Sequence, residues 1–161
     1  MKTIGTMRAL DTQLGAVRVE DVYDTDINDL WQACTQPDRL TQWIAEVSGD
    51  LRVGGGFYAT FTSTGAGAGR VEACDAPHHL LLTMLPGTAD EQQIEAWFAA
   101  EGDKTRLTVE NRGLALAELP LHGAGWQAHL EDLGRSLDGE PSSWNARWSE
   151  LTPVYQLMPL A

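Results

Sequence analysis

The chain has 161 residues, of which 43% are hydrophobic and 21% charged, a balance that indicates one folded domain and excludes a disordered chain. Its 11 basic residues against 23 acidic ones give a net charge of −12. Nucleic-acid binding and attachment to an anionic membrane both need a basic surface, so we expect neither as a partner.

The cysteines and the N-terminus indicate where the protein works. Cys34 and Cys74 show no spacing typical of a metal site or a redox pair. The N-terminus has no apolar segment typical of a secretory signal, and no apolar run is long enough for a transmembrane helix. We therefore expect a protein of the reducing cytoplasm.

The first predicted elements are a strand over residues 14–23 and a helix that Asp26 can cap. The apolar stripe of this helix consists of Ile27, Leu30, Trp31 and Cys34. Pro37 ends the helix, and a second short helix is predicted over residues 38–44.

The middle of the chain is predicted to form strands joined by short turns. The strands cover residues 46–53, 56–63, 69–75, 79–85, 92–100 and 104–111. Glycine-rich turns are expected at residues 54–56 and 65–69. Connections this short favour antiparallel hairpins, because a parallel crossover needs a dozen residues or more.

The longest predicted helix covers residues 120–138 and ends before Gly139 and Pro141. Its apolar face consists of Trp126, Leu130, Leu133 and Leu137. Ser142 can cap a further helix that carries Trp144, Trp148 and Leu151 and stops near Pro153.

This order of elements predicts an α+β fold. The strands follow one another instead of alternating with helices, which excludes a doubly wound sheet. One curved antiparallel sheet that grips the long C-terminal helix, with two short helices after the first strand, buries the apolar stripes most economically.

Five segments carry a resemblance to a known family. They are residues 17–43 with Leu30-Trp31-Gln32-Ala33, Pro37 and Trp43; Val-Gly-Gly-Gly-Phe at 53–57; and residues 69–84, 105–114 and 125–133. In this order and spacing the chain resembles bacterial homologues of the activator of the heat-shock-protein-90 ATPase. These proteins belong to the START-like, or SRPBCC, superfamily with a helix-grip fold.

The resemblance implies a START-like domain over residues 1–139, with a cavity between sheet and helix that binds a small hydrophobic molecule. Two features depart from the family. Met84 stands where the family often has tryptophan, which changes the expected cavity wall. Residues 140–161 lie outside the family core and are expected to pack on the domain or on a partner.

Cofactor and metal sites are not predicted. The glycine-rich segments precede strands, whereas phosphate sites need a helix N-terminus or cationic help. His78 and His79 are adjacent and point to opposite faces of a strand. His129 and Asp132 share a helix face, but two ligands do not make a zinc site, so we interpret the histidine as exposed.

Catalytic residues are not assigned either. Glu72, Glu95 and Glu110 fall on predicted strands, where a carboxylate turned into a cavity can act as a general base. By alternation, Glu95 and Glu110 lie opposite their apolar neighbours, which favours an exposed sheet face. Motifs of nucleophilic enzymes are missing.

Aromatic residues give the strongest functional signal. Trp31 and Phe98 belong to regular apolar stripes and are interpreted as core, and Tyr58 lies near the same space. The residues predicted to line a ligand cavity are Trp43, Phe57, Phe61, Thr83, Met84, Trp97, Trp126 and Leu130.

Three functions therefore remain open. The first is binding of a small hydrophobic ligand for transport or sensing. The second is a chaperone-associated role, with Trp144, Trp148 and Tyr155 of the tail as an apolar contact surface, which also leaves a homodimer open. The third is a polyketide-cyclase-like enzyme, which needs a buried acid or base.

Overall fold

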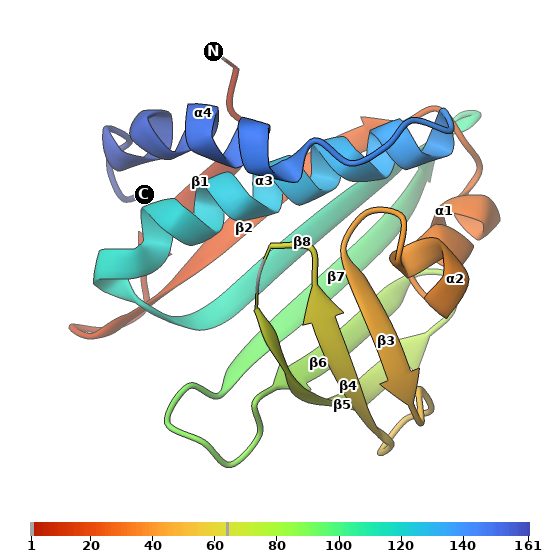
Figure 1. The fold of residues 1–161 in the computed structure, drawn as a ribbon, viewed down its shortest axis with the longest axis horizontal. Coiled ribbons are helices and arrows are strands. Elements are labelled where there is room, and N and C mark those ends of the chain that lie inside the picture. Colours follow the sequence, from red (N-terminus) through yellow and green to blue (C-terminus); the bar gives the residue numbers. More distant parts are fainter. Residues whose placement is uncertain (1, 64) are drawn as a thin grey trace.

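The computed structural model describes residues 2–63 and 65–161 and shows one eight-stranded antiparallel sheet with helices on one side (Figure 1). The strands are β1 (Gly5–Ala9), β2 (Leu14–Tyr23), β3 (Ala45–Gly49), β4 (Gly56–Phe61), β5 (Ala66–Asp75), β6 (His79–Met84), β7 (Gln92–Glu101) and β8 (Lys104–Ala115). The helices are α1 (Ile27–Ala33), α2 (Pro37–Leu40), a 3₁₀ turn (Leu116–Glu118), α3 (Leu119–Leu137) and α4 (Trp144–Gln156).

The strand order is β1-β2-β8-β7-β6-β5-β4-β3, so consecutive hairpins run from β3 to β8 and the first two strands complete the sheet. This confirms the predicted helix-grip architecture. The short strand β1 was not predicted, because residues 5–9 lack a clear apolar alternation. It pairs with β2 through Met7 and Val17, which places Met7 in the core.

The second glycine-rich segment was wrongly predicted as a turn. Residues 66–69 belong to β5, and its glycines make room for neighbouring side chains. A Cβ atom at Gly69 would overlap the Phe57 ring, and one at Gly67 would overlap the Leu85 side chain. The first segment does contain a turn, in which Gly54 has a φ of +82°.

The two short helices close one end of the concave face (Figure 1). Asp26 caps α1 as predicted, accepting a hydrogen bond from the Asp29 N–H at 2.8 Å. Helix α2 ends at Leu40, earlier than predicted, and turns lead from there to Ile44. The indole of Trp43 donates to the Ala33 carbonyl at 2.9 Å and so ties the second segment to the first.

Helix α3 crosses the concave face of the sheet, and α4 packs against α3 (Figure 1). Residues 123–125 are small and fully enclosed, and a Cβ atom at Gly123 would lie 2.6 Å from the Tyr155 ring of α4. This close approach explains why α4 does not stop at Pro153 as predicted. The proline lies inside the helix because the buried Tyr155 anchors the turn that follows it.

Gln127 joins the two termini to α3. Its side-chain oxygen accepts hydrogen bonds from the Ile4 N–H at 3.2 Å and from the Tyr155 hydroxyl at 2.6 Å. Its nitrogen donates to the Lys2 carbonyl and to Glu131, both at 3.0 Å. A buried amide needs such partners, because an unpaired one costs about 1–3 kcal/mol.

The close approach of α3 and α4 yields a test with two glycines of the same helix. Gly123→Ala should destabilise the protein by about 1–3 kcal/mol, because the new methyl group overlaps the Tyr155 ring. Gly134→Ala is the control: its Cβ would lie 3.7 Å from Tyr23, an ordinary contact, and alanine favours helix by up to about 1 kcal/mol. Urea unfolding measures both, and equal stabilities would contradict the packing described here.

Candidate functional site

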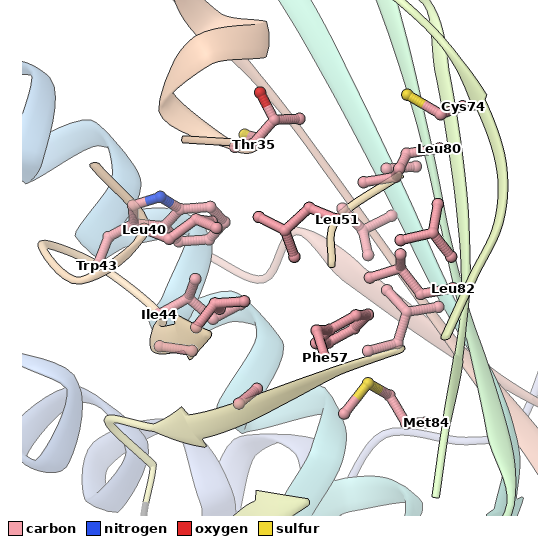
Figure 2. Close-up of a pocket in the computed structure, with 18 of the residues that line it drawn as sticks. Thr35, Leu40, Trp43, Ile44, Leu51, Phe57, Cys74, Leu80, Leu82 and Met84 are labelled. Carbon is pink, nitrogen blue, oxygen red and sulfur yellow. The ribbon is translucent and has the colours of Figure 1, made fainter. Parts of the chain in front are cut away.

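A cavity of about 190 Å³ lies between the concave face of the sheet, helix α3 and the segment of α1 and α2. Figure 2 shows Leu51 and Phe57 near its centre, with Trp43 on one side and Leu82 on the opposite wall. We refer to it as the inner cavity. Its surface is almost entirely aliphatic and aromatic.

The alternation of the strands builds this surface. Every second residue of β4, β6 and β7 faces inward, so that Phe57, Leu82 and Phe98 belong to one wall. Ala59 and Ala96 occupy inward positions on these strands. Their side chains are too small to fill the space in front of them, which leaves the interior open.

The structure brings together Trp43, Phe57, Phe61, Met84 and Trp126, all of which line the inner cavity. They come from three separate elements, β4, β6 and α3, and from the turn after α2. Met84, at the position where the family often has tryptophan, is buried and forms part of this wall. Four aromatic residues and Met84 of the predicted set therefore lie on the wall of this cavity.

Three predicted residues do not line the cavity. Thr83 lies between two inward residues of β6, so its side chain faces the opposite side of the sheet. Trp97 also lies on that outer face, where the Arg18 guanidinium stands 5.4 Å from its ring. Leu130 is fully buried, but its turn of α3 packs over Tyr23, whose hydroxyl donates to the Leu130 carbonyl at 2.8 Å.

Tyr58 likewise lies outside the expected space. It is 52% exposed, because it alternates with the inward-facing Phe57 and Ala59 on β4. An aromatic residue on a strand therefore lines the cavity only if the alternation of the strand also turns its side chain inward.

Sequence reasoning missed the residues at one end of the cavity. Thr35 and Leu51 come from connections and Cys74 from the end of β5; in Figure 2, Thr35 and Cys74 lie toward one end of the cavity and Leu51 lies nearer its centre. Leu51 follows β3 and was placed inside a strand by the prediction. No local pattern shows that these segments face one another, because only the sheet order brings them together.

The carboxylates lie opposite the cavity, as their alternation predicts, but Glu110 is not exposed. It is 5% accessible and accepts two hydrogen bonds from Arg8, each of 2.9 Å. Arg112 Nη1 lies 3.3 Å from Glu110 Oε1 and 2.8 Å from Glu95 Oε1, and so links the two carboxylates. The other oxygen of Glu95 lies 2.6 Å from His79 Nε2. This ionic cluster covers the outer face and supplies no acid or base to the cavity.

His129 was wrongly interpreted as exposed. It is 6% accessible and stands between the rings of Trp126 and Trp144, with centroid distances of 5.8 and 5.5 Å. Burial lowers its pKa to about 4, although a contact with the Trp43 carbonyl partly opposes this shift. The ring is therefore neutral at pH 7. Within the described residues, no group of His, Cys, Asp or Glu has a metal-binding arrangement.

Comparisons with known proteins agree with this architecture. The family model described as "Activator of Hsp90 ATPase homolog 1-like protein" matches residues 24–138. No curated protein matches the chain. Among residues 2–63 and 65–161, no helix has the length and apolar character that crossing a bilayer requires.

Several solved structures share the fold. CalU16 from Micromonospora echinospora is 25% identical with a TM-score of 0.76, over 96% of this chain and 95% of that one. DynU16, from the dynemicin biosynthetic locus, is 26% identical with a TM-score of 0.72, over 79% of this chain and 49% of that one. Protein MLL2253 from Mesorhizobium loti is 23% identical with a TM-score of 0.68, over 77% and 97% respectively, and shows the fold alone.

The outer ionic cluster predicts a pH-dependent stability. Hydrogen bonds from Arg8, and then from Arg112, hold the pKa of Glu110 at about 2, below its ordinary value of 4.5. The folded state therefore binds the proton of Glu110 less tightly than the unfolded state does. The stabilisation from this carboxylate is fully present above about pH 4.5 and is lost as the pH falls toward 2. Glu110→Gln should therefore cost about 1–2 kcal/mol at neutral pH, with the deficit closing in that window.

Urea unfolding at a series of pH values measures this deficit. Glu46→Gln, at an exposed position of β3, is the control and should follow the wild-type curve. A Glu110→Gln deficit that stays constant down to pH 2 would show that packing, and not charge, is responsible.

Proposed function

The chain belongs to the Activator of Hsp90 ATPase homolog 1-like family, and from this premise we propose that it binds a small apolar molecule in the inner cavity. The observation that carries the proposal is an interior space of about 190 Å³ with an aliphatic and aromatic surface. Protein interiors otherwise contain few voids larger than a water molecule.

The energetic cost of such a space supports occupancy. Apolar space that is left empty inside a protein costs stability, at roughly 24 cal/mol per Å³ where it is fully enclosed, because the walls lose van der Waals contacts. About half of the lining residues are buried, and Cys74 is exposed. A bound ligand recovers this energy by restoring contacts along the walls.

The size and chemistry of the cavity define the ligand class. An engineered apolar cavity of about 150 Å³ holds benzene, so this one suits a ligand of about one or two rings, or a short alkyl chain. Thr35, Cys34 and Cys74 are its polar groups at one end. Such a ligand gains its affinity mainly from apolar burial, at roughly 25 cal/mol per Å² before the cost of association.

The same surface favours binding over catalysis. Burial raises the pKa of the Cys34 thiol far above its usual range, which leaves it uncharged and a poor nucleophile. The carboxylates nearest in sequence to the walls, such as Glu95, are committed to ion pairs on the outer face. A cyclase-like reaction needs an acid or base that touches the ligand, and the inner cavity offers none among the described residues.

A chaperone-associated role is the second candidate, and the family description is what supports it. The contact surface expected in the tail is not favoured by the packing. Trp144 and Tyr155 are buried against α3, and Trp148 stacks on Trp144 with ring centroids 5.4 Å apart. Stimulation of chaperone ATP turnover would therefore have to use another surface.

Both cysteines are free thiols, which supports the proposal that this function is exercised in the cytoplasm. The similarity to DynU16, from the dynemicin biosynthetic locus, supports a small organic molecule as the ligand class.

A pair of alanines on β7 tests the site. Ala96 faces the inner cavity, whereas Ala99 lies on the outer face and is exposed. Wild-type protein should bind naphthalene in equilibrium dialysis. Ala96→Leu should weaken this binding at least tenfold, because the larger side chain occupies the cavity, and Ala99→Leu should leave it unchanged.

Three results would count against the proposal. They are absence of naphthalene binding to the wild type, equal binding by both variants, and loss of binding in Ala99→Leu alone. Circular dichroism of each variant confirms that the fold is retained before affinities are compared.

A further inference from the structure

A second and larger cavity adjoins the inner one. It has a volume of about 420 Å³ and lies between α3, the beginning of α4 and the strand ends near residues 65–67 and 85. We refer to it as the outer chamber. The residues that line both spaces are Ile44, Phe61, Met84, Ile94 and Trp126. The two cavities therefore border on the same side chains and adjoin each other.

The outer chamber differs from the inner cavity in chemistry. It combines three indole rings, those of Trp126, Trp144 and Trp148, with polar side chains that include His129 and Asn111. Its volume falls in the range of about 300–1,000 Å³ that is typical of small-molecule sites, whereas the inner cavity alone is smaller.

Asn111 is already fully engaged. Its side-chain oxygen accepts from the Trp126 indole N–H at 3.0 Å, and its nitrogen donates to Gln92 and to the Gln93 carbonyl, each at 3.0 Å. These bonds fix the indole of Trp126 between the two cavities.

Among residues 2–63 and 65–161, no hydrogen bond uses the Nε2 nitrogen of His129. Its Nδ1 lies 3.4 Å from the Trp43 carbonyl, and a carbonyl oxygen only accepts, so Nδ1 carries the proton. The buried ring is neutral, with a pKa of about 4. Its Nε2 therefore has a free lone pair that can accept a hydrogen bond from a molecule in the chamber.

Backbone strain marks the same chamber. Leu85 has a φ of +55°, in the left-handed region that residues other than glycine rarely adopt. Its side chain occupies the space that a Cβ atom at Gly67 would need, and both residues line the chamber. Strain of this kind persists where the surroundings impose it, and it concentrates at ligand sites.

We propose that the two cavities form one binding site for an aromatic alcohol, whose apolar rings fill the inner cavity and whose hydroxyl group donates to His129 Nε2 in the outer chamber. This proposal rests on the proposed function, because the inner cavity must bind the apolar part. It narrows the ligand class to ring systems that carry a hydrogen-bond donor. It also assigns recognition of that donor to one residue of α3, His129.

The test compares two ligands of similar shape that differ in the donor. 2-Naphthol has a hydroxyl donor, and 2-methoxynaphthalene has only an acceptor at the same position. Wild-type protein should bind 2-naphthol about fivefold more tightly in equilibrium dialysis, the size expected for one net hydrogen bond. His129→Phe should abolish this preference, and the exposed control His78→Phe should retain it.

A measurement on the wild type covers the case in which His129→Phe does not fold. In ¹⁵N NMR of the histidine side chains, 2-naphthol should shift the Nε2 resonance of His129, and 2-methoxynaphthalene should not. An unchanged Nε2 resonance with bound 2-naphthol would overturn the proposal.

The naphthalene experiment separates this proposal from the proposed function. If naphthalene fails to bind, the inner cavity is not a ligand site and the proposed function fails. If naphthalene binds but 2-naphthol shows no preference over its methyl ether, or if the preference survives in His129→Phe, only the role of His129 is wrong.

Discussion

The enclosure of helix α3 on two sides is the constraint on which the rest of the structure depends. The sheet covers one face and α4 covers the other, so the buried polar side chains of this helix depend on protein partners. Gln127 obtains its partners from both chain termini, and Asp132 accepts hydrogen bonds from Ser142 and from the Ser143 N–H. The tail is thus part of the domain's packing, because it satisfies groups that the sheet cannot reach.

The same enclosure creates the two cavities. The sheet curves around α3 without closing on it, and small inward residues such as Ala59 and Ala96 leave the space unfilled. Trp126 lies at the boundary because Asn111 of β8 holds its indole from the sheet side. A tryptophan in this position separates an apolar interior from a chamber with hydrogen-bonding groups, and that division gives the site two ends of different chemistry.

Much of this arrangement could be predicted from local pattern. The apolar stripe and cap of α1, the hairpins from β3 to β8 and the long helix all depend on neighbouring residues, and each was predicted within a few positions. The cavity residues were predicted less well. Trp97 and Trp126 are both aromatic, but one lies on the outer face and the other on the cavity wall. Composition does not distinguish them, since the difference depends on strand parity and helix orientation.

The sequence by itself determined the fold class, the antiparallel order of the central strands and the apolar character of the interior, because these follow from periodicity and turn chemistry along the chain. Only the tertiary structure decided that Glu110 is buried by arginines, that His129 is enclosed between indole rings, and that α4 continues past Pro153. Burial of a polar residue depends on partners from distant segments. The packing of the sheet, α3 and α4 determines which partners meet. That packing cannot be predicted from the sequence of a single segment.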